Sequence, residues 1–201
     1  AMSVQLVRQS LVVFTVVAWS SVAVAHAESP LIPRATTVSS EERMKFLLHL
    51  PKGYANTDEL YPLILFLHGG GESGDDLELV KRNGITKEIE NGRELPFIVI
   101  APQNPHRRGL WDDRALFALL QDQMDELRVD RSRIYLAGLS RGGHGVFRLA
   151  VQHPTTFAAV AVVCGGGPIT YAGWCKDTPF WFFHGDRDLA VPTEESIRLS
   201  A

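Results

Sequence analysis

The stretch R-I-Y-L-A-G-L-S-R-G-G-H-G-V, residues 133–146, joins an apolar run to a cluster of glycines and places one serine between them. The apolar run is typical of a buried strand, and the residues after Ser140 can begin a helix. Gly138 and Gly142 would let the two backbones approach closely at a sharp turn. The hydroxyl of Ser140 would then lie at a helix N-terminus, where backbone N–H groups favour negative charge. The spacing predicts that Ser140 is a nucleophile, and the alternative is an ordinary glycine-rich turn.

Other apolar runs of similar length recur along the chain, with amphipathic segments between them. Continuous apolar strands are typical of a parallel sheet that helices cover on both faces. We therefore expect an α/β fold with a mostly parallel sheet and helices on both faces. Polar residues that follow the strands should converge on one edge, beyond the carboxyl ends of the strands. The expected strands are 44–51, 62–67, 97–101, 133–138, 157–164 and 180–183, and the expected helices are 115–127, 145–153 and one that begins at Thr193.

Two further motifs follow expected strands and suit the chemistry of a serine nucleophile. The glycines of H-G-G-G (68–71) would let backbone amides point at a developing oxyanion, and the N–H groups of Gly70 and Arg141 are the expected donors. A plain turn is the alternative for this motif. In H-G-D-R-D (184–188), a carboxylate could orient a histidine and stabilise its imidazolium form. Of the two carboxylates in this motif, we favour Asp188 for that role.

Together these segments resemble the α/β-hydrolase superfamily, and within it the secreted bacterial esterases of the phospholipase/carboxylesterase and feruloyl-esterase-like type. The shared segments cover most of residues 44–196 and are L-P-K-G-Y, L-F-L-H-G-G-G-E-S-G, A-P-Q, V-D-R-S-R-I-Y-L-A-G-L-S-R-G-G, H-P-T-T-F-A-A-V, C-G-G-G and F-F-H-G-D-R-D-L-A-V-P. The resemblance implies the nucleophile Ser140, oxyanion amides at Gly70 and Arg141, and the acid Asp188. It also implies cleavage of small-molecule or polysaccharide-linked carboxylic esters through an acyl-serine intermediate, without a cofactor. One departure is Arg141, where relatives often carry Met.

In this superfamily the base histidine comes after the acid, in a loop that follows one more strand. Residues 189–201 contain no histidine. Among the remaining histidines, only His106, after the strand 97–101, is a candidate substitute. We therefore expect a C-terminally truncated hydrolase that lacks the last strand and helix, and whose activity is low because the triad is incomplete. The alternatives are a serine peptidase of the same fold and a non-catalytic binding protein on a hydrolase scaffold.

Residues 1–27 have the layout of a secretory signal peptide, with a positive charge, an apolar run over 11–25 and small residues at the expected cleavage point, 25–27. Ala1 precedes the initiating methionine and reads as an added residue. The apolar run is shorter than the roughly 20 residues of a membrane-spanning helix, although an uncleaved anchor is the alternative. We expect a single domain over 28–201, secreted or periplasmic, without stable membrane insertion after cleavage.

Composition argues against several classes of partner. The 201 residues carry a formal net charge of −3 and no basic run, so nucleic acid is not an expected partner. No cluster of cysteines and histidines has metal-ligand spacing, so no metal is expected. Cys164 and Cys175 could form a disulfide in an exported protein, or could stay as one buried and one loop thiol.

Two residues are predicted to contact the substrate because of their places along the chain. Trp111 lies in a loop on the expected active edge, and Gln103 directly follows the strand 97–101. The alternative for Trp111 is packing in the core, which is the commoner fate of tryptophan.

Overall fold

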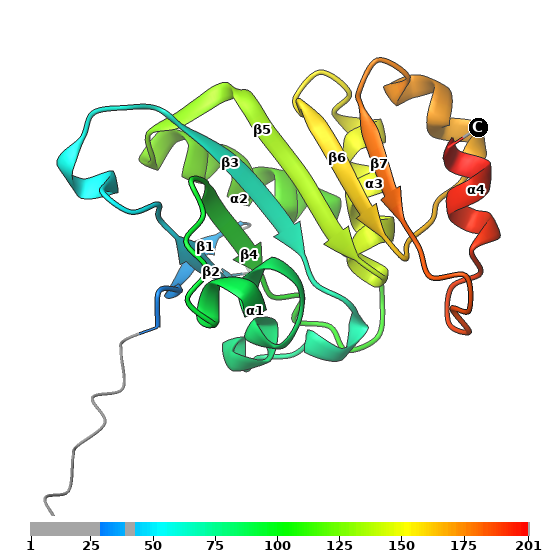
Figure 1. Cartoon of the computed structure of the whole chain (residues 1–201), viewed down its shortest axis with the longest axis horizontal. Helices are drawn as coiled ribbons and strands as arrows, with labels where there is room; N and C mark the ends of the chain where they lie inside the picture. Colours follow the sequence, from blue (N-terminus) through cyan, green and yellow to red (C-terminus); the bar gives the residue numbers. More distant parts are fainter. Residues whose placement is uncertain (1–28, 39–42, 201) are drawn as a thin grey trace, which may run out of the picture.

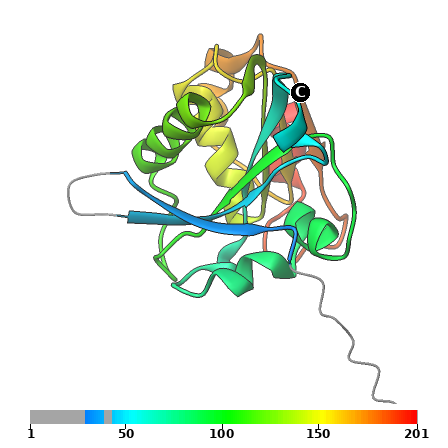
Figure 2. The same ribbon diagram turned by 90° about the vertical axis from the view of Figure 1, so that its left-hand side faces the viewer.

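The computed structural model describes residues 29–38 and 43–200, so the expected signal segment lies outside the described residues. These residues form a seven-stranded sheet with helices against both faces (Figures 1 and 2). The strand order is β1-β2-β4-β3-β5-β6-β7. The strands are β1 (Ile32–Thr37), β2 (Arg43–His49), β3 (Tyr61–Leu67), β4 (Ile98–Pro102), β5 (Val129–Leu139), β6 (Ala159–Val163) and β7 (Phe180–Phe183).

The sheet is antiparallel at one edge and parallel elsewhere. Strand β2 runs antiparallel to both β1 and β4, whereas β4, β3, β5, β6 and β7 run parallel to one another. The expected mostly parallel sheet is therefore confirmed. Strand β1 was not expected, because its exposed residues show no apolar alternation and include Pro33. Proline is tolerated there because β1 lies at the edge, where one side of the strand needs no partner.

Helices α2 (Asp113–Glu126) and α3 (Arg141–Gln152) lie against one face of the sheet. Helix α1 (Gly84–Glu90) lies against the other face, and α4 (Glu194–Ser200) lies beside β7 (Figures 1 and 2). Short 3-10 segments complete the structure: η1 (Tyr54–Asn56), η2 (Gly70–Glu72), η3 (Leu77–Arg82) and η4 (Ile169–Cys175). Within the described residues, no helix has both the length and the apolar content needed to cross a bilayer.

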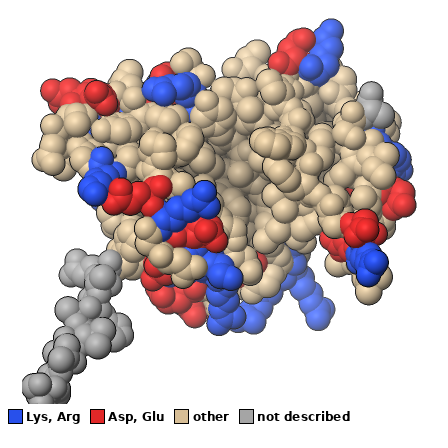
Figure 3. Space-filling view, viewed as in Figure 1, with Lys and Arg blue, Asp and Glu red and all other residues tan. Residues whose placement is uncertain are grey.

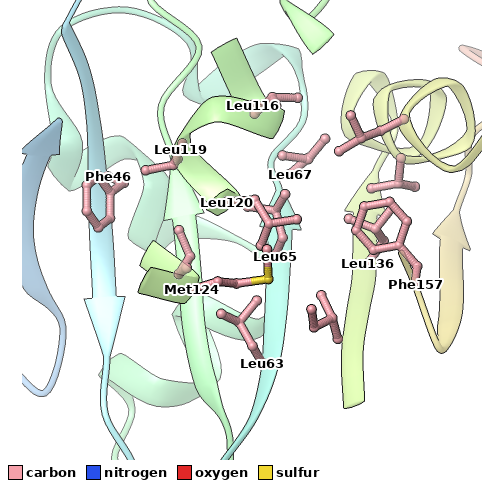
Figure 4. Close-up of a cluster of buried hydrophobic side chains, with 14 of the residues drawn as sticks. Phe46, Leu63, Leu65, Leu67, Leu116, Leu119, Leu120, Met124, Leu136 and Phe157 are labelled. Atoms are coloured by element: carbon pink, nitrogen blue, oxygen red, sulfur yellow. The ribbon is translucent and has the colours of Figure 1, made fainter. Parts of the chain in front are cut away.

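Strand β3 shows how the core is built on both faces. Leu63, Leu65 and Leu67 pack with the apolar stripe of α2 and with α3 (Figure 4). On the opposite face, Phe66 packs with Ile89 of α1. The continuous apolar run therefore has the two-sided burial that its sequence predicts.

Helix α3 begins at Arg141, four residues before the start expected from its apolar pattern. Its first five residues include Gly142, Gly143 and Gly145, which are poor helix formers. Close packing compensates for this low propensity: a Cβ on Gly143 would lie 2.8 Å from the Cα of Gly165. The helix can start close to the end of β5 because its glycines carry no side chains that would separate it from the neighbouring backbone.

Candidate active site

Ser140 occupies the sharp turn between β5 and α3. Its backbone has φ 55° and ψ −114°, a strained conformation for a residue that is not glycine. Its N–H donates to the carbonyl of Val163 (2.8 Å), and its carbonyl accepts from the N–H of His144 (3.1 Å). Such strain costs about 1–3 kcal/mol and persists only where surrounding contacts enforce it, commonly at functional sites. The structure thus has the sharp strand-to-helix turn that the sequence predicts.

Gly142 brings the end of β3 against this turn. A Cβ at Gly142 would lie 1.9 Å from the carbonyl oxygen of Leu67, so no side chain fits there. The loop that follows β3 is consequently held beside Ser140. A Cβ on Gly69 would lie 3.6 Å from the Cβ of Ser140.

Gly70 and Arg141, which carry the two expected oxyanion donors, approach each other through the side chain of Arg141. Gly70 begins the 3-10 segment η2, and a Cβ on it would be 2.9 Å from Nη2 of Arg141. Arg141 is the first residue of α3, where backbone N–H groups have no acceptor within the helix. The positive end of the dipole of α3 therefore lies directly after Ser140 in the chain.

His68 braces the loop after β3. The side chain is buried, with its residue 1% exposed. Its Nδ1–H donates to the carbonyl of Gly69 (2.6 Å), and its Nε2 accepts from the N–H of Asn104 (3.0 Å). These partners require the neutral ring protonated at Nδ1. Burial lowers the pKa of His68, which the hydrogen bond to Gly69 and the nearby charge of Glu72 oppose. With both ring nitrogens occupied, His68 is a structural residue.

Gln103 and Trp111 are placed away from solvent. They are 2% and 3% exposed, respectively. The side-chain amide of Gln103 donates to the carbonyls of Glu72 (2.9 Å) and Asp76 (2.6 Å). The ring of Trp111 packs against His68, with centroids 4.8 Å apart, and belongs to the core. The substrate contact expected of both residues stays a prediction: in this structure Gln103 bonds the loop after β3, and Trp111 packs on His68 of the same loop.

Asp188 lies in the loop after β7 and is held by backbone donors. Its Oδ1 accepts from the N–H groups of Ala190 (2.8 Å) and Val191 (3.0 Å). These hydrogen bonds, first that of Val191 and then that of Ala190, lower the pKa of Asp188, and the nearby ring of His184 adds to the effect. Its Oδ2 is 3.5 Å from Nε2 of His184. Asp188 is therefore a fixed, readily ionised carboxylate.

Cys164 directly follows β6, and its N–H donates to the carbonyl of Phe183 (2.7 Å). Burial raises the pKa of the Cys164 thiol, and the charge of Asp188 raises it further, while a hydrogen bond from the backbone of Ser140 opposes the rise. Cys164 and Cys175 are both free, so the disulfide that the sequence left open is not formed.

Hydrogen bonds join none of the described histidines to the hydroxyl of Ser140. His144 bonds the backbone carbonyl of Ser140 through Nδ1 (3.1 Å). His184 bonds the hydroxyl of Ser196 and the carbonyl of Val191. His106, the substitute base considered from the sequence, lies in the exposed loop after β4. Residues 29–38 and 43–200 also contain no group of three side chains suited to a metal ion.

Comparison with known proteins identifies the family. Residues 37–190 match the Esterase family, whose description is "Putative esterase". "Probable feruloyl esterase C" of Aspergillus terreus is 28% identical over 171 residues, which cover 78% of this chain and 59% of that protein. A solved structure described as a thermostable esterase is 30% identical, with a TM-score of 0.71, and the match covers 85% of this chain and 50% of that one. The chain therefore spans little more than half the length of these relatives.

A more distant structure extends the likeness of fold. Est1E from Butyrivibrio proteoclasticus is 16% identical, with a TM-score of 0.63, and the match covers 84% of this chain and 83% of that one. At this identity the similarity concerns the fold alone. Taken with the match over residues 37–190, the parallel sheet and the turn at Ser140, these findings show that the chain belongs to the Esterase family and has an α/β-hydrolase fold.

Proposed function

We propose that Ser140 is the nucleophile of a carboxylesterase. Its Oγ attacks the carbonyl carbon of a carboxylic ester, the alcohol leaves, and the acyl group stays on Ser140 until water displaces it. The observation that carries the proposal is the strained turn at Ser140, at the N-terminus of α3 and beside the glycine-rich loop after β3. We also propose that residues 1–27 direct export of the protein to the periplasm or the exterior. Residues 28–201 would then belong to a single catalytic domain.

The N–H groups of Gly70 and Arg141 would stabilise the oxyanion of the tetrahedral intermediate. Each donor of this kind contributes about 2.7–4 kcal/mol to transition-state stabilisation. The neighbouring helix terminus supports the assignment because it favours negative charge at the same place. No cofactor is needed for this step, since the charge develops against fixed backbone dipoles.

Asp188 would orient the histidine that takes the proton of Ser140. Its carboxylate is ionised and held by two backbone N–H groups, which suits that role. Because no histidine in the described residues bonds Oγ of Ser140, we expect only slow hydrolysis from this chain alone. A missing triad base leaves about 10³–10⁴-fold catalysis over water in known serine hydrolases.

The substrate class follows from the family relatives. Names such as feruloyl esterase support an ester of an aromatic acid, carried by a small alcohol or by a polysaccharide. The chain spans only part of those proteins, so this assignment is part of the proposal.

The test compares matched serine and aspartate variants in the natural open reading frame that contains this sequence. Ser140→Ala should lower hydrolysis of a short p-nitrophenyl ester by about 10³-fold or more, whereas Ser132→Ala, on the exposed part of β5, should not. Asp188→Asn should lower the rate, and Asp186→Asn should change it little. An unchanged rate in Ser140→Ala would refute the assignment, and faster cleavage of a peptide than of the ester would favour a peptidase.

A further inference from the structure

Two loops at the carboxyl edge of the sheet are joined to each other by buried hydrogen bonds. They are residues 68–76, after β3, and residues 103–112, after β4. The N–H of Gly74 donates to the carbonyl of Asn104 (2.9 Å), and the side chain of Gln103 donates to two carbonyls of the first loop. These hydrogen bonds join the two loops into one layer beside Ser140.

The side chain of Arg141 ties the outer side of this layer to helix α3. Its Nη1 donates to Oγ of Ser73 (3.1 Å) in the first loop and to the carbonyl of His106 (3.4 Å) in the second. Its Nη2 donates to the carbonyl of Arg107 (3.1 Å). A planar guanidinium with five N–H donors can satisfy three acceptors from two loops at once, which a lysine ammonium does with less geometric control.

Gly70 gives this side chain its room. A Cβ on Gly70 would lie 2.9 Å from Nη2 of Arg141 and 3.2 Å from its Cζ. The guanidinium thus lies directly over the backbone of the residue whose N–H is the expected oxyanion donor. A shift of the guanidinium would therefore break its hydrogen bonds to both loops and remove its packing against Gly70.

We propose that the side chain of Arg141 is a positioning residue, which clamps the loops after β3 and β4 onto the helix of the nucleophile and so fixes the N–H of Gly70. This role is separate from that of the Arg141 backbone N–H, and it rests on the proposed esterase function. The clamp acts through geometry: small displacements of a preorganised donor lower the rate of the chemical step more than they lower substrate binding.

Kinetics in the natural open reading frame test the catalytic part of the proposal. Arg141→Met should lower kcat for an uncharged p-nitrophenyl ester by about tenfold with little change in KM, and Arg141→Lys should restore part of the loss. Ser73→Ala should lower kcat less than Arg141→Met does. Its effect should be smaller in the Arg141→Met background, because both substitutions remove the same hydrogen bond between Arg141 and Ser73. Arg108→Met is the matched control, because the structure gives the Arg108 side chain no hydrogen bond or ion pair to any described residue, and it should leave kcat unchanged.

Two kinetic outcomes would overturn the clamp. One is an unchanged kcat in Arg141→Met. The other is a rise in KM limited to an ester whose acyl chain ends in a carboxylate, which would show that Arg141 attracts anionic substrates.

Amide hydrogen exchange tests the clamp independently of the esterase proposal, because the measurement does not depend on catalytic activity. Arg141→Met should speed exchange in residues 70–76 and 105–110 by about tenfold, leaving β5 and β6 unchanged, whereas Arg108→Met should change neither. Unchanged exchange in both loops overturns the clamp even where Ser140→Ala abolishes hydrolysis. If Arg141→Met speeds exchange in both loops but Ser140→Ala keeps full activity, the clamp is supported as a structural contact. The same result overturns the esterase proposal and, with it, the proposed effect of Arg141 on kcat.

Discussion

The two halves of the carboxyl edge of the sheet are built differently. On the side of β3 and β4, the polar residues His68, Gln103 and Asn104 are buried and hydrogen-bonded to neighbouring loops. On the side of β7, Trp181 is 69% exposed and Phe183 is 42% exposed. Ser140 lies between the two halves. The half that would meet the oxyanion is therefore held together by buried hydrogen bonds, whereas the half that carries Asp188 adjoins an open apolar surface.

The open half is an uncovered part of a sheet face. Trp181 and Phe183 point to the same side of β7, with ring centroids 4.7 Å apart. In Figure 3 the middle of this face, over β5 and β6, is hollowed and free of charged side chains, which gather at its rim. An exposed apolar surface beside an edge strand favours association with other chains. Substitutions in the two halves test this contrast, and a pair of histidines on the side of β3 and β4 tests the effect of burial there.

The largest effect is expected at the junction of β3 and α3. Gly142→Ala would place its Cβ 1.9 Å from a carbonyl oxygen of Leu67, a clash that only backbone movement could relieve. We expect a loss of more than about 4 kcal/mol in the free energy of unfolding, enough to prevent folding of a marginal domain. Gly185→Ala, in the open half, meets no atom within 4 Å and should change that free energy by less than about 0.5 kcal/mol. Urea unfolding followed by circular dichroism measures both, and equal midpoints would contradict the contrast.

A second, intermediate effect compares apolar residues of the two halves. Leu65 in β3 is fully buried, so Leu65→Ala should lower the free energy of unfolding by about 2–5 kcal/mol. Trp181→Ser, in β7, removes an exposed ring and should cost less than about 1 kcal/mol while reducing self-association. Chemical denaturation and light scattering report the two quantities. A larger stability loss from Trp181→Ser than from Leu65→Ala would show that the face of β7 is covered.

The smallest effect concerns pH and the buried ring of His68. Because burial lowers its pKa below the ordinary value of 6.5, the unfolded chain takes up the proton first as the pH falls. The contribution of His68 to stability is therefore complete above pH 6.5 and declines as the pH falls from 6.5 toward the folded-state pKa. His68→Leu should cost about 1–3 kcal/mol at pH 8, since Asn104 loses its acceptor, and less at pH 5.

Exposed His106 provides the control for that experiment. His106→Leu should change the free energy of unfolding by less than about 0.5 kcal/mol at either pH. Denaturation curves of both variants at pH 5 and pH 8 give the comparison. A loss in His68→Leu that grows on acidification would mean that the ring is protonated in the folded protein.

Much of the fold could be predicted from local patterns. Strand β7 was expected at its observed bounds, and β2, β3, β4, β5 and β6 were expected with ends within four residues of those observed. Helix α1 was missed because it is short, with seven residues, and lies among turns that carry no clear 3.6-residue period. The early start of α3 was missed because its glycines have low helix propensity and only packing compensates for it.

Among the site residues too, some could be predicted from local sequence patterns and others could not. The turn at Ser140 follows from a local pattern, since glycines at 138 and 142 leave a strand and a helix free to meet there. The hydrogen-bond partners of Gln103 lie 27 and 31 residues away along the chain, so the local sequence around Gln103 does not predict its burial. The burial of Gln103 could not be predicted for that reason, and the same holds for the packing of Trp111 against His68.

The sequence by itself determined the α/β architecture, the turn at Ser140 and the glycine-rich loop beside it, because strand period and glycine conformation act over a few residues. Only the tertiary structure decided which polar groups are buried, which tautomer His68 adopts and where the guanidinium of Arg141 binds. Those features depend on groups that are distant in sequence and meet only when the loops at the sheet edge are packed together. Burial then fixes their hydrogen bonds, since an unpaired polar group in the interior costs about 1–3 kcal/mol.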